Sequence, residues 1–265
     1  MESLTFTVRP LSDVLKAETL GTEGSLVDRI YAVLRRAIID LSLPPDLPLV
    51  EQEVAAALQT SKTPVREAII RLAREGLVEV KAKSGSYVTP ISIERYLEAC
   101  FVRMQLEVGC VRRLASRRIS PADQVLMRAF IAEQEAAFAA NDDARFFAAD
   151  EAMHHGLFEL AGLPGVWRTM NLAKAELDRV RHLKRRFGNR QRQLVIEEHK
   201  ALIEAIIAGD PAAAERALLD NIGAVEEEIA ALARHPGLLR TIEDLNALVA
   251  IEHRLRGGKT SRKAS

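Results

Sequence analysis

The sequence contains few aromatic residues, only two cysteines and no excess of either charge. Aromatic side chains make up 5% of its 265 residues, whereas Ala, Leu, Glu and Arg recur throughout. Such a composition favours packed helices over a β-sandwich. Lys plus Arg and Asp plus Glu each number 37, so the net charge argues neither for nor against nucleic acid as a partner. Only the local distribution of charge can decide that question.

The scarce cysteines and the lack of long apolar runs exclude several protein classes. Cys100 and Cys110 fall in one predicted helix, roughly 15 Å apart along its axis, which is too far for a disulfide. We expect reduced, buried thiols, as in a reducing cytoplasm. The sequence has neither a stretch that could span a bilayer nor the basic and apolar regions of a signal peptide. It therefore predicts a soluble, cytoplasmic protein with no membrane partner.

Hydrophobic residues make up 48% of the chain, which is enough for a sizeable core, and the length allows two domains. Residues 50–77 are predicted to form two short helices joined by a polar turn over 59–62. Pro64 is compatible with the second helix because the N–H groups of a first turn have no helical partner. The apolar residues of that helix share one face, and they are Val65, Ile69 and Leu72. This layout predicts a helix-turn-helix, whose second helix enters the major groove of DNA.

A helix precedes this motif, and a hairpin follows it. Residues 77–81 alternate in β fashion and lead through a turn into a second short strand over 86–89. The three helices and the hairpin together predict a winged helix-turn-helix DNA-binding domain over 25–90. The residues before it, 1–24, show no clear period and are predicted to form a flexible N-terminal arm.

From Ile93 onward the apolar pattern is helical almost without interruption. Short connections predict an all-α antiparallel helical bundle over 91–235, so the fold class is mainly α. A last helix over about 238–254 and a basic, disordered tail are predicted to occupy 236–265. The helices expected in the bundle lie at about 93–117, 121–140, 142–161, 165–187, 190–208 and 211–234.

Two sets of residues carry a family resemblance. The first is Ser61-Lys62-Thr63-Pro64-Val65-Arg66-Glu67-Ala68, Arg71-Leu72, Glu75-Gly76-Leu77-Val78 and Gly85-Ser86-Tyr87-Val88. The second is Arg103 with Glu107, Asp150 with His154, and Glu198 with His199. The first set resembles the DNA-binding domain of GntR-family transcription regulators, and the second resembles the FCD effector domain of the FadR-type branch. The resemblance covers about 25–235 and implies that the bundle binds an effector and dimerises.

The resemblance assigns DNA contacts to the start of the second helix of the motif. The physical reading agrees, because hydroxyl and N–H groups at a helix N-terminus suit phosphate oxygens, and Arg suits the paired acceptors of guanine. Alternatively, Arg66 and Arg71 are solvated charges paired with Glu67 or Glu75. The predicted DNA-binding residues are Ser61, Lys62, Thr63, Arg66, Arg71, Lys83 and Arg35.

The charge within this region is also nearly balanced. Between Val50 and Lys83, six basic side chains stand against five acidic ones, which is a modest excess for a DNA reader. One domain alone should therefore bind weakly. We expect a homodimer that reads two half-sites of a double-stranded DNA operator.

A candidate metal site begins with Asp150 and His154, which are four residues apart and hence on one helical face. Carboxylate and imidazole at this spacing make half of a divalent-metal site. The resemblance makes His199 the next ligand and places Asn221 where the family usually has a third His. Because an amide oxygen is a weaker transition-metal ligand than imidazole, we expect a lower metal affinity and a shift in preference towards harder ions. The ion could be zinc, nickel or manganese-like. Alternatively, Asp150 and His154 form a salt-bridged pair without metal.

A strongly basic run over 179–186 suggests how a ligand could be held. Arg179 or Arg181, together with Arg103, could pair with a carboxylate, so we expect a small carboxylate-bearing metabolite as effector. The resemblance then implies a ligand-responsive transcription regulator, most often a repressor in this family. The alternative is a metal-dependent helical-bundle enzyme that uses Asp150, His154 and His199. We find no catalytic acid–base pair or nucleophile motif beside these ligands, and so predict no enzyme.

Overall fold

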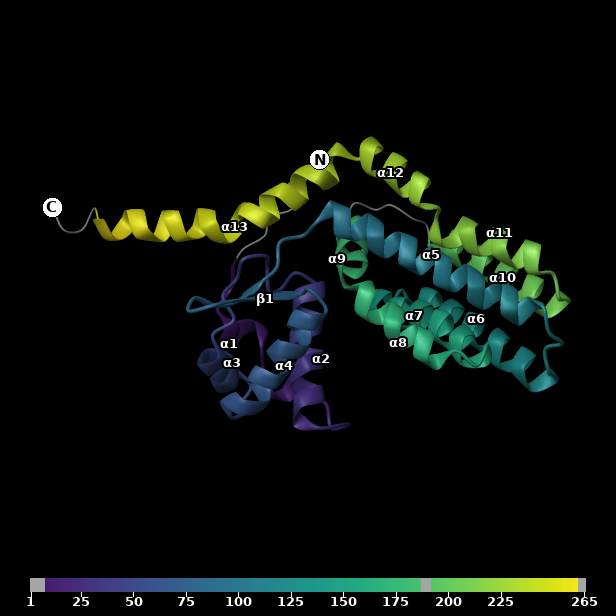
Figure 1. The fold of residues 1–265 in the computed structure, drawn as a ribbon, viewed down its shortest axis with the longest axis horizontal. Helices are drawn as coiled ribbons and strands as arrows, with labels where there is room; N and C mark the ends of the chain where they lie inside the picture. Colours follow the sequence, from purple (N-terminus) through teal and green to yellow (C-terminus); the bar gives the residue numbers. More distant parts are fainter. Residues whose placement is uncertain (1–7, 187–191, 262–265) are drawn as a thin grey trace. The chain divides into compact units, whose positions relative to one another are not determined.

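The computed structural model describes residues 8–186 and 192–261. It is mainly α-helical with one two-stranded sheet, which confirms the predicted fold class (Figure 1). The chain forms two compact units. Within the described residues, the winged unit comprises 8–93, 175–184 and 234–261, and the bundle unit comprises 94–174, 185–186 and 192–233. In this part of the chain, no helix is both long and apolar enough to cross a membrane.

The winged unit contains the three helices expected around the helix-turn-helix. They are α2 (Leu26–Ile39), α3 (Glu51–Ala57) and α4 (Lys62–Arg74). A capping box starts α2, because the Ser25 hydroxyl accepts from the Asp28 N–H at 3.2 Å and the Asp28 carboxylate accepts from the Ser25 N–H at 3.0 Å. The apolar faces of the three helices share one core, which includes Leu34, Val54 and Leu72.

The predicted wing is present as an antiparallel hairpin of β1 (Val78–Lys81) and β2 (Gly85–Val88). Val78 pairs with Val88, and both side chains are buried in the core of the winged unit. Lys83 lies in the turn with a φ of 61°. The turn thus projects a basic side chain at the tip of the hairpin.

Further segments belong to the winged unit although the sequence did not assign them to it. They are α1 (Leu11–Val14), a 3-10 helix (Ala17–Thr19), α9 (Ala175–Arg186, assigned to this unit through Lys184) and α13 (Pro236–Ser261). The described part of the predicted flexible arm is not loose, because Leu11 and Leu15, four residues apart, are buried in this core. α13 runs past the predicted end at 254, and the last predicted tail residues, 262–265, lie outside the described part.

The bundle unit is built from seven helices among the residues that the structure describes. They are α5 (Ile93–Ala115), α6 (Pro121–Ala139), α7 (Asp143–Leu160), α8 (Pro164–Ala173), α10 (Arg192–Ala208), α11 (Pro211–Ile222) and α12 (Val225–Arg234). Two predicted helices are each divided. Lys174 separates α8 from α9, and Gly223, in the left-handed region with a φ of 80°, ends α11 before α12. Within the described residues Cys100 and Cys110 form no disulfide, and only Cys110 is buried, whereas both thiols were predicted to be buried.

Candidate functional site

The N-terminus of α4 exposes the residues predicted to contact DNA. Ser61 is the N-cap residue, yet its side chain makes no capping hydrogen bond. Pro64, the third helical residue, removes one of the two N–H groups from which an N-cap hydroxyl usually accepts. Ser61, Lys62, Thr63 and Arg66 are all exposed. The Ser61 hydroxyl therefore lies at the surface, close in sequence to the cationic Lys62 and Arg66.

Side chains of α3 accept hydrogen bonds from the cationic side chains of α4. The Arg66 guanidinium donates to both carboxylate oxygens of Glu51 at 2.8 Å, and the Lys62 ammonium donates to the Gln52 amide oxygen at 3.2 Å. These hydrogen bonds from Arg66 lower the pKa of Glu51, so the pair is ionised. The partner of Arg66 is thus Glu51 rather than Glu67, the partner that the solvated-charge alternative expected.

The remaining predicted DNA residues differ in accessibility. Arg71 lies on the exposed side, where it donates to Asp28 at 2.5 Å and lies 4.2 Å from the Tyr31 ring centroid. Hydrogen bonds from Ser25 and then from Arg71 lower the pKa of Asp28 to about 2. Lys83 is exposed at the wing turn.

Arg35 does not fit its predicted role as a DNA contact. Its side chain is only 19% exposed and donates to Glu75 at 3.0 Å and to Asp178 of α9 at 3.3 Å. Both acceptors are themselves buried or half-buried, so the guanidinium is occupied inside the winged unit. The sequence could not reveal this, because Asp178 lies 143 residues away along the chain.

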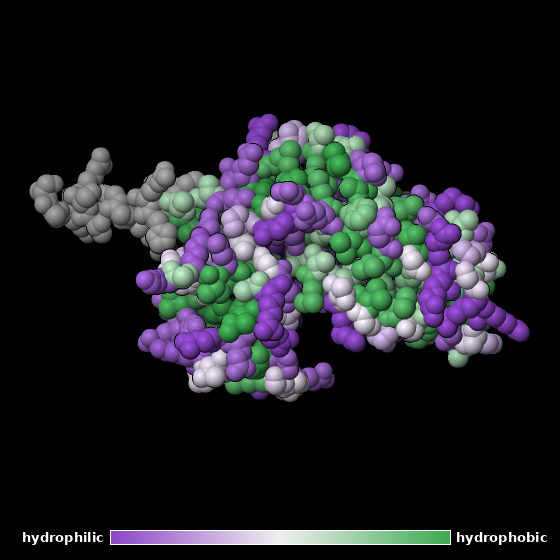
Figure 2. Space-filling model, viewed as in Figure 1, coloured by the Kyte–Doolittle hydropathy of each residue, from purple (hydrophilic) through white to green (hydrophobic). Residues whose placement is uncertain are grey.

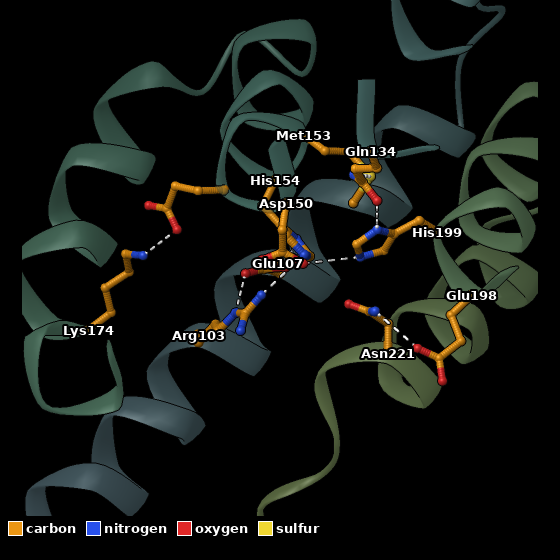
Figure 3. A network of polar contacts seen from close by, with 11 residues as sticks. Arg103, Glu107, Gln134, Asp150, Met153, His154, Lys174, Glu198, His199 and Asn221 are labelled. Carbon is orange, nitrogen blue, oxygen red and sulfur yellow. Dashed lines mark hydrogen bonds and ion pairs between the residues drawn. The ribbon is translucent and has the colours of Figure 1, made fainter. Parts of the chain in front are cut away.

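The bundle unit gathers the predicted metal ligands in its interior (Figure 3). Asp150 and His154 lie on α7, His199 on α10 and Asn221 on α11, and none is more than 5% exposed. One ligand atom from each of Asp150, His154 and His199 lies within 4.8 Å of the other two. Buried polar groups this close need mutual compensation or a bound ion.

His199 presents a free lone pair to this cluster. Its Nδ1 lies 2.7 Å from the Gln134 amide oxygen, an acceptor, so Nδ1 carries the proton and Nε2 does not. Nε2 is buried, lies 3.7 Å from an Asp150 oxygen, and the Asn221 side chain is a further neighbour of the ring. Burial, opposed by the charge of Asp150, lowers the pKa of His199 to about 4. The ring is therefore neutral near pH 7, the form that binds metals.

His154 is oriented by two residues of α5. The Arg103 guanidinium can only donate, and its Nη2 lies 3.2 Å from His154 Nε2, so Nε2 is the accepting nitrogen. His154 Nδ1 lies 2.7 Å from Glu107, whose other oxygen accepts from Arg103 Nε at 2.6 Å. Burial alone would raise the pKa of Glu107, but Arg103 and His154 hold it well below its usual range. Glu107 is therefore an anion shared by both neighbours.

Two orienting residues, Glu107 and Gln134, were not predicted as site residues. Glu107 contributed to the family resemblance but was given no role. Gln134 is completely buried and lies three residues after Ile131 and seven after Met127, on the same buried stripe of α6. A polar residue on an otherwise apolar helical stripe was the signal that could have identified it.

The other predicted ligand contacts separate into two groups. The Asn221 amide nitrogen donates to Glu198 at 3.1 Å, and its oxygen is turned towards the centre of the cluster (Figure 3). Arg179 and Arg181, by contrast, belong to the winged unit. Arg179 is fully buried there and donates to the Thr89 carbonyl at 2.9 Å. Arg103, the remaining predicted carboxylate partner, contacts His154 of the cluster.

Comparison with known proteins matches these two parts of the chain separately. Residues 26–88 match the family described as bacterial regulatory proteins, gntR family, and residues 98–224 match the FCD domain. The chain is also 36% identical over 213 residues to an uncharacterized HTH-type transcriptional regulator in an unstable DNA locus of Streptomyces ambofaciens, with 80% of this chain and 89% of that protein covered. The chain belongs to the GntR family.

Other relatives agree with this assignment. The HTH-type transcriptional repressor RspR of Escherichia coli is 31% identical over 202 residues, which cover 76% of this chain and 87% of that protein. The solved structure of E. coli McbR/YncC has the same fold, with a TM-score of 0.67 at 20% identity, over 80% of this chain and 99% of that one. This GntR-family protein is a DNA-binding transcription regulator with an FCD domain. The family and its members are regulators and not enzymes, so the enzyme alternative has no support.

Proposed function

We propose that this GntR-family regulator is a homodimeric repressor whose operator affinity changes when a small carboxylate-bearing metabolite binds in the bundle unit. A divalent ion held by the Asp150–His154–His199 cluster is part of that binding site. The relative RspR is named a repressor, which supports the sign of regulation. We also propose that the protein acts in the cytoplasm.

On the DNA side, we propose that the N-terminus of α4 contacts bases and phosphates. The free Ser61 hydroxyl, Thr63 and Lys62 suit phosphate oxygens, and Arg66 suits guanine. Arg66 is 65% exposed and its partner Glu51 is on the surface, so exchanging Glu51 for a base edge requires no opening of the core. Arg71 and Lys83 are proposed phosphate contacts. Arg35 is not, because its guanidinium pairs with Glu75 and Asp178 inside the winged unit.

Two observations support a dimer: the nearly balanced charge of the helix-turn-helix region, and large apolar side chains exposed on the bundle unit. Figure 2 shows apolar surface over the helices of the bundle unit. Several large apolar side chains there are exposed, namely Phe101, Val125, Leu126, Phe138, Leu172, Leu194 and Ile229. Exposed apolar groups of this size commonly mark a protein interface.

On the ligand side, the buried Nε2 atom of His199 is the observation that carries the proposal. This nitrogen faces Asp150 in a cluster of buried ligand atoms that all lie within 4.8 Å of one another, and burying such groups together is costly unless an ion or mutual pairing compensates them. Asp150, His154, His199 and Asn221 would hold the ion, while Glu107 and Gln134 fix the ring orientations. When bound, the ion supplies positive charge for a ligand carboxylate. With an amide in the ligand set, we propose an ion of the manganese type, with zinc and nickel as the alternatives.

This site is tested by ion binding to the purified full chain. The protein is stripped with a chelator, dialysed against Mn²⁺, Zn²⁺ or Ni²⁺, and its bound metal is quantified. We expect about one ion per chain in the wild type and a loss of it in His199→Ala. The matched control is His155→Ala, because the His155 side chain is 45% exposed and pairs with Glu159, although it lies next to His154 on the same helix. Equal ion content in wild type and His199→Ala would refute the site.

A further inference from the structure

Arg103 contacts the nitrogen of His154 that would bind an ion at this site. Its Nη2 is 3.2 Å from His154 Nε2, while its Nε is 2.6 Å from Glu107 (Figure 3). The guanidinium side chain is 9% exposed, so solvent does not easily replace these contacts. The corresponding nitrogen of His199 lies 3.7 Å from an Asp150 oxygen. The Nε2 atom of His154 therefore contacts a cation, whereas that of His199 faces an anion.

While Arg103 donates a hydrogen bond to His154 Nε2, that nitrogen cannot also bind a metal ion. Because a guanidinium has no acceptor, His154 Nε2 must use its only lone pair to accept from Arg103. That lone pair is the same one that a metal ion would take. Bound together, the ion and Arg103 would also place two positive charges side by side in the protein interior. His154 can therefore serve only one of the two cations.

We infer that Arg103 and the divalent ion compete for His154 Nε2, and that the ion releases Arg103 Nη2 to pair with the ligand carboxylate. This inference rests on the proposed ion site. The carboxylate compensates the second positive charge, so ion and anion promote each other's binding. Glu107 remains the fixed anion between Arg103 and His154, because each of its oxygens contacts one of them. Binding of ion and effector is thereby coupled through one side chain.

The coupling is measured by calorimetric titration of Zn²⁺ into the metal-free full chain, with acetate absent or in excess as the anion probe. In the wild type we expect acetate to tighten Zn²⁺ binding by at least about 5-fold, the lower end of typical coupling between sites. Arg103→Gln should bind Zn²⁺ more tightly than the wild type without acetate, and acetate should then have no effect. Arg112→Gln is the matched control, because Arg112 lies on the same helix and pairs with Glu215 at the surface.

Arg103→Lys guards against misfolding, since it keeps a positive charge beside buried Glu107 but lacks the forked donor pair. It should change Zn²⁺ binding in the same direction as Arg103→Gln. Zn²⁺ binding that is no tighter in either variant than in the wild type would overturn the competition while leaving the ion site intact. An acetate effect that persists in Arg103→Gln would do the same. Binding of Zn²⁺ by none of the proteins would instead overturn the proposed site together with this inference.

Discussion

Arg66 and Arg145 form nearly identical surface pairs in different parts of the chain. Arg66 donates to both oxygens of Glu51 at 2.8 Å, and Arg145 donates to both oxygens of Glu133 at 2.7 and 2.9 Å. Surface pairs of this kind add little to stability. Of the two, Arg66 lies near the N-terminus of α4, the helix proposed to contact DNA, so the difference between the two residues should lie in DNA binding.

The first prediction uses this similarity. Arg66→Ala should weaken operator binding by about tenfold or more, because a bidentate contact to guanine is lost, and it should leave the thermal midpoint almost unchanged. Arg145→Ala should change neither quantity. Fluorescence anisotropy with the DNA upstream of the regulator's own gene measures the affinity. Equal weakening by both variants would show that Arg66 acts through general charge and not through base contact.

A second residue-scale prediction concerns Cys110, which is buried in the bundle core. Burial, and then the negative charge of Glu107, raise the pKa of this thiol to about 12. The reactive thiolate is therefore scarce at pH 9 and should still be increasing at about pH 11, whereas an exposed thiol, with a pKa of about 8.5, levels off near pH 10. In Cys100→Ser, labelling with a disulfide reagent should show this displaced pH profile. A plateau near pH 10 in the folded protein would contradict the burial of Cys110.

Sequence spacing predicts which site residues share one face of a helix. Asp150 and His154, four apart, do lie on one face, and His199 joins them from α10. Which nitrogen of each ring is free depends on partners from distant segments. Gln134 is 65 residues from His199, and Arg103 is 51 residues from His154. No local pattern encodes such contacts.

At the scale of elements, α9 departs most from expectation. The run over 165–187 was predicted as one helix lining the ligand cavity, but it is divided at Lys174, which is 4% exposed and pairs with Glu151 at 2.6 Å. Beyond the break, Asp178 pairs with Arg35 and Arg179 contacts Thr89 inside the winged unit. Helical periodicity continues across the break, so the sequence shows the helix but not the unit to which it belongs.

The third prediction tests α9 as a structural part of the winged unit. Arg179→Met removes a fully buried guanidinium and leaves Glu176 and the Thr89 carbonyl without that donor. Loss of one partner from a buried pair costs about 3 to 5 kcal/mol. Urea denaturation followed by far-ultraviolet circular dichroism should show this loss. Arg168→Met, at an exposed position of α8, is the control and should leave the transition unchanged.

The single tryptophan shows where the destabilisation arises. Trp167 belongs to the bundle unit and is packed in its core, so its fluorescence reports the unfolding of that unit. We expect Arg179→Met to shift the circular dichroism transition more than the Trp167 transition. A shift confined to Trp167 fluorescence would mean that α9 stabilises the bundle unit, as the sequence had suggested.

At the scale of the whole molecule, the balance of charge decides how DNA can be bound. The chain carries 37 basic and 37 acidic side chains, and several cations near α4 are already paired with Glu51, Asp28 or Gln52. Since phosphate contacts supply most non-specific affinity, a single winged unit has little of it. Affinity must then come from two units acting together, and this requires the proposed homodimer.

The last prediction follows from this requirement. An operator with two half-sites should bind at least about 100-fold more tightly than the same DNA with one half-site scrambled, because the second contact becomes intramolecular. Inserting five base pairs between the half-sites turns one of them to the opposite side of the helix, since a turn takes about 10 base pairs. That DNA should bind as weakly as the single half-site, whereas an insertion of ten should restore part of the affinity. Anisotropy titrations at one fixed salt concentration compare the four DNAs, and equal affinity for all of them would show that one winged unit suffices.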